Sequence, residues 1–90
     1  MEHELNSNDL FTVALVSLDM ALAGPTSLRV HRAGVLVDFW LEYAGPVLED
    51  PDAGLGDKVE FGRQVDAVLR LQAKLAAKLI SEIEAQGREV

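Results

Sequence analysis

The first helix predicted in this chain is apolar almost all the way round. Its only polar residues between positions 10 and 23 are Thr12, Ser17 and Asp19. A helix with so little polar surface has to be buried on nearly every side. Two neighbouring helices in a small domain cannot cover it completely. We therefore expect apolar surface to remain that only a further protein surface can cover.

Stop signals divide the chain into three helices, predicted at about 7–23, 27–44 and 58–86. Gly24-Pro25 ends the first, because glycine accepts the left-handed conformation and proline cannot continue the hydrogen-bond ladder. Gly45-Pro46 repeats the signal, and Gly87 ends the third helix. We expect a single helical domain over 7–87, a flexible N-terminal tail over 1–6 and an acidic loop over 46–57.

Capping residues mark the start of each helix. Asn6 is the predicted N-cap of the first, with Leu5 and Leu10 placed as a hydrophobic staple. Thr26 or Ser27 caps the second helix. The third opens with Asp57-Lys58-Val59-Glu60, which has the spacing of a capping box.

The fold class predicted is all-α, a three-helix bundle. The two short helices form a hairpin of about 25–27 Å, and the C-terminal helix is about 43 Å long at 1.5 Å per residue. Roughly 15–18 Å of the long helix therefore projects beyond the hairpin. Because that part is still apolar on one face, we expect two copies to dimerise into a larger helical bundle.

The second helix has an inward side that we expect to be widened by Leu28, Val35 and Phe39. Trp40 is expected in the core and Tyr43 at the surface. Gly34 costs roughly 1 kcal/mol against alanine inside a helix. Two explanations fit the presence of Gly34: another backbone approaches the helix closely at this position, or the glycine has no function and the helix tolerates it. The inward residues are Val30, Ala33, Val37, Trp40, Leu41 and Ala44.

The third helix has one broad apolar stripe from Phe61 to Ile83, which Gln72 interrupts near its centre. A buried polar residue in such a seam can fix the register of paired helices. The pattern slightly favours the alternative, a Gln at the edge of the stripe with its amide in solvent. The candidate interface residues of the whole chain are Leu15, Val16, Tyr43, Gln72, Leu75, Leu79, Ile80 and Ile83.

Composition excludes several function classes. The net charge of -7 argues against nucleic acid as a partner, because phosphates require clustered Lys and Arg. The absence of cysteine excludes disulfides and thiol chemistry. The acidic N-terminus is unlike a signal peptide, and the apolar run from 10 to 23 is shorter than a membrane span. We expect a cytoplasmic protein with no membrane contact.

Site signatures are sparse, and we predict no catalytic residue, no cofactor and no metal. Ser27 and His31 lie one turn apart, but Asp38 is about 10 Å further along the helix and cannot orient the histidine. The Asp50-x-Asp52-x-Gly54 start of a calcium loop fails at its later ligand positions. One candidate anion site lies at the start of the second helix, formed by Thr26, Ser27, Arg29 and Arg32.

The sequence favours a non-catalytic regulator that binds another protein, such as an inhibitor, an antiactivator or a chaperone. It would act as a homodimer through its apolar helix faces. The first alternative is a structural subunit of a larger bacterial or phage assembly, in which the same surface forms permanent interfaces. The second is a small protein that binds an anion or a nucleotide at the start of the second helix. The identity of the protein partner does not follow from the sequence.

Overall fold

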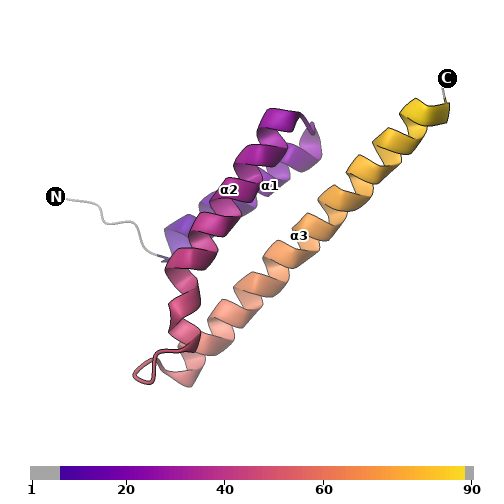
Figure 1. Cartoon of the computed structure of the whole chain (residues 1–90). Helices are drawn as coiled ribbons and strands as arrows, with labels where there is room; N and C mark the ends of the chain where they lie inside the picture. Colours follow the sequence, from indigo (N-terminus) through magenta and orange to yellow (C-terminus); the bar gives the residue numbers. More distant parts are fainter. Residues whose placement is uncertain (1–6, 89–90) are drawn as a thin grey trace.

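The computed structural model describes residues 7–88, and within them the chain forms three α-helices. Helix α1 spans Ser7–Ala23, α2 spans Ser27–Ala44 and α3 spans Leu55–Arg88; a short 3₁₀ helix, η1, spans Gly45–Leu48. Helices α1 and α2 form a hairpin, and α3 runs beside it and projects past its tip (Figure 1). The predicted all-α, three-helix architecture is confirmed.

The bounds predicted for the first two helices are confirmed, whereas α3 is longer than predicted at both ends. It begins at Leu55, where the Lys58 N–H already bonds the Gly54 carbonyl at 3.3 Å. Asp57 therefore lies in the first turn and is not the N-cap. Since η1 takes up residues 45–48, the acidic loop shrinks from 46–57 to residues 49–54.

The glycines do not adopt the left-handed conformation that the sequence suggested, because no glycine among residues 7–88 has a positive φ. Gly45 has φ -56° and ψ -38°, so the chain passes from α2 directly into η1. Gly87 continues α3. The proposed N-cap Asn6 and the staple residue Leu5 lie outside the described residues.

Side chains from the other two helices bond the C-terminal end of α1. Lys78 Nζ donates to the Leu22 carbonyl at 2.6 Å, and Arg29 Nη1 donates to the Gly24 carbonyl at 3.0 Å. Cations are favourable at a helix C-terminus, where the carbonyl groups lack partners within the helix. The Lys78 bond ties the tip of the hairpin to α3, and the Arg29 bond closes the hairpin itself. Together they satisfy carbonyl groups at the end of α1, where a left-handed glycine was expected.

Trp40 is the centre of the core and contacts all three helices. Its side chain is 0% exposed and lies 5.5 Å, between ring centroids, from both Phe11 of α1 and Phe61 of α3. The core placement predicted for Trp40 is confirmed. The remaining core is aliphatic: Leu10, Ala14, Leu18, Ala21, Ala33, Val37, Ala44, Val68 and Leu75.

The molecule is more extended than its length requires. Its radius of gyration is 16.0 Å, against about 12 Å for a compact chain of 90 residues. The whole chain, ends included, exposes 6575 Å², whereas a compact protein of 9.8 kDa exposes about 5,200 Å². At 34 residues, α3 is about 51 Å long, roughly twice the length of either hairpin helix.

Candidate functional site

The two ends of the molecule differ in how far they are closed. At one end, which we call the closed end, η1 and residues 49–54 join α2 to α3, and the aromatic core fills the space between the helices. At the other, the open end, α3 extends away from the start of α2 (Figure 1). At this end a groove runs between α2 and α3.

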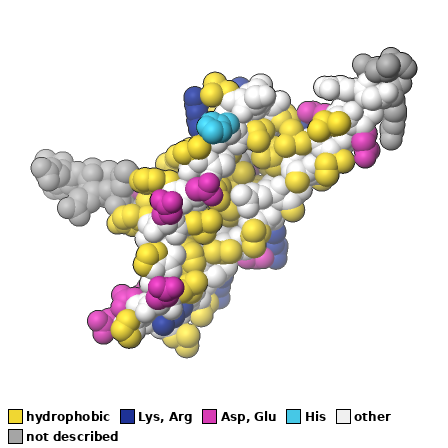
Figure 2. Space-filling view, viewed as in Figure 1, with side chains coloured by type: hydrophobic (Ala, Val, Ile, Leu, Met, Phe, Trp, Pro, Cys, Tyr) yellow, Lys and Arg dark blue, Asp and Glu magenta, His cyan; other side chains and the backbone are white. Residues whose placement is uncertain are grey.

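Two hollows of about 230 and 500 Å³ make up this groove, and both are lined by Val30 of α2 and Leu79 of α3. The inner hollow is lined by Leu18, Val30, Ala33, Gly34, Gln72, Leu75, Ala76 and Leu79. The outer one adds Ile83, Ser27 and His31. Hydrophobic side chains gather between α2 and α3 and along the projecting part of α3 (Figure 2). The inner hollow is thus mainly apolar, whereas the outer one also has polar side chains on its walls; both are open to solvent. The polar residues of the outer hollow are Thr26, Ser27, His31, Glu82 and Gln86.

The α2 wall of the groove is fixed by the cap of that helix. Thr26 has an extended backbone, and its Oγ1 accepts a hydrogen bond from the Arg29 N–H at 3.2 Å. This fixes where α2 begins, and helical spacing then places Val30 and Gly34 on one side, toward α3. Gly34 has open space where a Cβ would stand, with no heavy atom within 4 Å. Within one chain, no other backbone approaches it closely.

The candidate interface residues lie in several different environments. Leu75 is only 6% exposed and belongs to the core, so it is not available at the surface as we expected. Leu79 is half-buried, whereas Ile80 and Ile83 are 56% and 67% exposed. Gln72 is half-buried in the groove wall. The hairpin and Lys78 reach further along α3 than the predicted lengths implied, which explains the burial of Leu75.

Helix α1 is buried on one side only. Leu15 is half-buried against the core, whereas Val13, Val16 and Met20 are 44%, 50% and 48% exposed. We call these three residues the α1 stripe. The incomplete cover expected for this helix is confirmed within residues 7–88.

Four residues expected on the inward side of α2 are exposed instead, and one of them is Leu41, which is 40% exposed. Leu28, Val35 and Phe39 lie at i, i+7 and i+11, and we call them the α2 stripe. The prediction was wrong because the small side chains Ala33 and Ala44, with Val37 and Trp40, already fill the space toward α1 and α3. Helical position could have separated the two sides, since the stripe is roughly opposite Val37.

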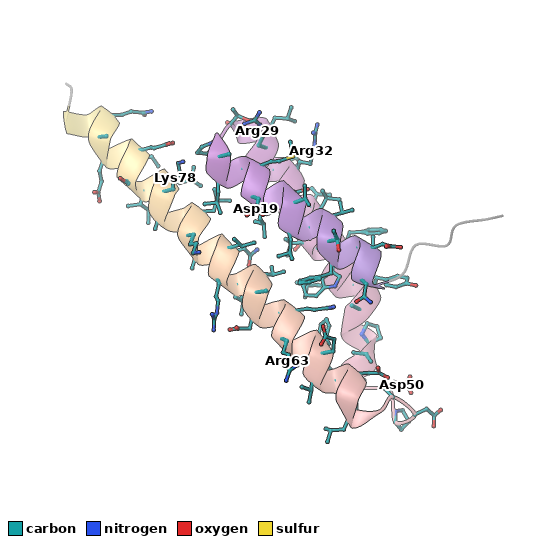
Figure 3. All side chains as sticks on the ribbon, turned by 180° about the vertical axis from the view of Figure 1, so that it is seen from behind. Asp19, Arg29, Arg32, Asp50, Arg63 and Lys78 are labelled. Atoms are coloured by element: carbon teal, nitrogen blue, oxygen red, sulfur yellow. The ribbon has the colours of Figure 1, made fainter. Side chains whose placement is uncertain are left out.

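Two of the four candidate anion-site residues have hydrogen-bond partners within the chain. The Arg29 guanidinium turns back to the Gly24 carbonyl, and the Thr26 hydroxyl is engaged as the cap. Figure 3 shows Arg29 and Arg32 at the tip of the hairpin and Lys78 on α3 beside it. Arg29 therefore neutralises the carbonyl end of α1, which explains a basic residue in the first turn of α2. Ser27 and Arg32 are exposed.

A hollow of about 600 Å³ lies at the closed end, beside the acidic loop. Tyr43 lines it and is 56% exposed, as expected. Gln64 is buried in its wall and donates to Asn8 Oδ1 at 3.0 Å. Asp50 Oδ1 accepts the Asp52 N–H at 2.9 Å, a turn within the loop. Among residues 7–88, no three acidic or histidine side chains come close enough together to hold a metal ion.

None of the helices in residues 7–88 combines the length and the apolar character that crossing a membrane requires. No protein-family model matches the chain, and no curated protein or solved structure matches it either.

Proposed function

We propose that this chain is a non-catalytic regulator that binds another protein, and that it does so as a homodimer through its apolar helix faces. The observation that carries the proposal is the apolar surface that stays exposed after folding. It comprises the groove, the projecting arm of α3 (the part of α3 that extends past the hairpin tip), and the α1 and α2 stripes. Scattered exposed hydrophobic side chains are ordinary, but aligned ones along whole helices mark binding surfaces.

The exposed apolar residues lie on more than one side of the molecule. The groove is bounded by α2 and α3, whereas the α1 stripe and α2 stripe lie on faces that do not line it. One surface can therefore bind a second copy while another binds a different protein. An amphipathic helix with basic residues beside its apolar side would suit this partner surface, because the chain has a net charge of -7.

Affinity purification from the native host, quantified by mass spectrometry, tests the partner surface. The wild-type chain is compared with Val16→Asp on the α1 stripe and Val35→Asp on the α2 stripe. Ala85→Asp on exposed α3 is the matched control, because it adds the same charge away from both stripes. We expect one protein to copurify with the wild type and the control and to be lost, at least tenfold, from a stripe variant. Equal recovery with all four chains would contradict the proposal.

An alternative function as a subunit of a bacterial or phage assembly is favoured by the shape of the molecule. Its extents of 58 × 31 × 16 Å and its apolar residues on several sides suit a component that contacts several neighbours. Light scattering after size-exclusion chromatography separates the two functions. A discrete dimer supports the regulator, whereas large polydisperse particles support the assembly subunit.

A further inference from the structure

Both walls of the inner hollow include small residues. Ala33 and Gly34 line it from α2, and Ala76 lines it from α3. Small residues let helix backbones approach closely, and Gly34 otherwise costs roughly 1 kcal/mol of helix stability. Because nothing within the chain lies within 4 Å of a Cβ at Gly34, the chain itself does not use this space.

A row of residues on α3 passes through Ala76 and extends along the helix in both directions. Leu69 and Ile83 lie seven residues, or two turns, on either side of Ala76 and are 57% and 67% exposed. Between them are Gln72, at the groove wall, and Ala76 itself. The row is therefore self-complementary if a copy of α3 lies against it in the opposite direction.

We propose that the groove is occupied by α3 of a second copy, running antiparallel, with Ala76 at the two-fold axis. Leu69 of each copy then packs against Ile83 of the other, and Gly34 lies against the partner's backbone. The start of α2 and the C-terminal half of α3 from both copies form a four-helix core. This inference deepens the proposed function, and it rests on that function's premise that the apolar faces bind protein.

The exposed area favours a second copy as the occupant. Leu69, Ile80 and Ile83 of α3 are 57%, 56% and 67% exposed, and a standard interface buries about 800 Å² from each partner, so an interface of that size covers α3 as well as the groove. A short foreign helix would fill the groove but leave the projecting arm of α3 uncovered. A second copy supplies both the helix that fills the groove and the surface that covers the arm.

Helix dipoles favour the antiparallel direction, because the positive end of each dipole then lies toward the negative end of the other. The ion pairs within each α3 are left intact, since Arg70 bonds Asp66 of its own helix at 3.0 Å.

Cysteine crosslinking tests both the occupant and the direction, because the chain contains no cysteine of its own. Under mild oxidation we expect Ala76→Cys to form a disulfide-linked dimer with most of the protein, since two axial cysteines meet. Ala85→Cys, exposed on the opposite side of α3, should remain at background. Leu69→Cys alone should also fail, because its two copies lie about 21 Å apart along the axis. A mixture of Leu69→Cys and Ile83→Cys chains should crosslink.

Self-crosslinking of Leu69→Cys would overturn the antiparallel arrangement in favour of a parallel one. A wild-type mass of 9.8 kDa by light scattering at micromolar concentration, with no Ala76→Cys crosslink, would overturn the second copy as occupant. Neither result alters the purification with Val16→Asp and Val35→Asp, which tests the binding of a different protein. Conversely, a confirmed dimer whose stripes bind nothing would overturn the proposed regulatory function while the dimer stands.

Discussion

The closed and open ends of this molecule are built from the same three helices, but only the closed end completes a core. At the closed end, Trp40 is enclosed by Phe11 and Phe61, one ring from each of the other helices. At the open end, Val30 and Leu79 face a groove. The apolar pattern of α3 is similar in both halves, so the pattern alone does not decide burial. What differs is the approach of α2 to α3: Trp40 and Phe61 are in contact at the closed end, whereas the groove separates the two helices at the open end.

The largest expected effect is at the closed end. Trp40→Ala removes the side chain that packs against a ring from each of the other two helices, and large-to-small changes of this kind cost about 3–5 kcal/mol. For a small domain this amounts to most of the stability. We expect the variant to lose its cooperative thermal transition, followed by circular dichroism. Trp40→Phe is the comparison, because it keeps a ring in place and also removes the indole Nε1, which is buried without a hydrogen-bond partner. Equal damage from both variants would show that ring packing is not the cause.

Leu75 and Ile83 sharpen the comparison within α3, because they lie two turns apart but only Leu75 is in the core. We expect Leu75→Ala to cost about 2–4 kcal/mol at any protein concentration. Ile83→Ala should cost little in dilute solution, where its side chain is already mostly exposed. Chemical denaturation at 1 and 100 µM, roughly the range that separates monomer from a micromolar dimer, measures both. A concentration-independent loss at Ile83 would mean that it packs within the single chain.

The sequence predicts most of the packing at the closed end and much less of the packing at the open end. Trp40 and the Thr26 cap follow from helical spacing and local backbone chemistry. The burial of Leu75 does not, because it depends on how far the hairpin reaches along α3. The role of Arg29 also escaped prediction, since it requires the end of α1 to lie beside the start of α2. The candidate interface could be located only in part: Val16, Ile80 and Ile83 are exposed, whereas Leu75 is not.

Lys78 holds α3 against the hairpin tip beside the open end, because its ammonium group bonds the last turn of α1 from α3. Lys78→Met keeps the apolar stem and removes the charged donor. A charge-assisted hydrogen bond at a helix C-terminus contributes about 1–2 kcal/mol, so we expect a loss of that size in urea denaturation. Lys74→Met is the matched control, because Lys74 is exposed on the same helix. Similar losses in both variants would assign the effect to net charge and not to the bond.

Replacing Gly34 or Gly62 by alanine should give the smallest change in stability, because a Cβ has open space at both positions within one chain. The two substitutions should differ in their effect on dimerisation. Each substitution by alanine should stabilise the isolated chain by up to about 1 kcal/mol, since glycine is the poorer helix former. Gly34 lies at the proposed contact with the partner's α3, whereas Gly62 lies outside the overlap. We therefore expect Gly62→Ala to raise stability at every concentration. Gly34→Ala should raise it in dilute solution and weaken dimerisation severalfold by sedimentation equilibrium. If both variants dimerise like the wild type, the helices do not approach closely at Gly34, and the small residues on the groove walls need another explanation.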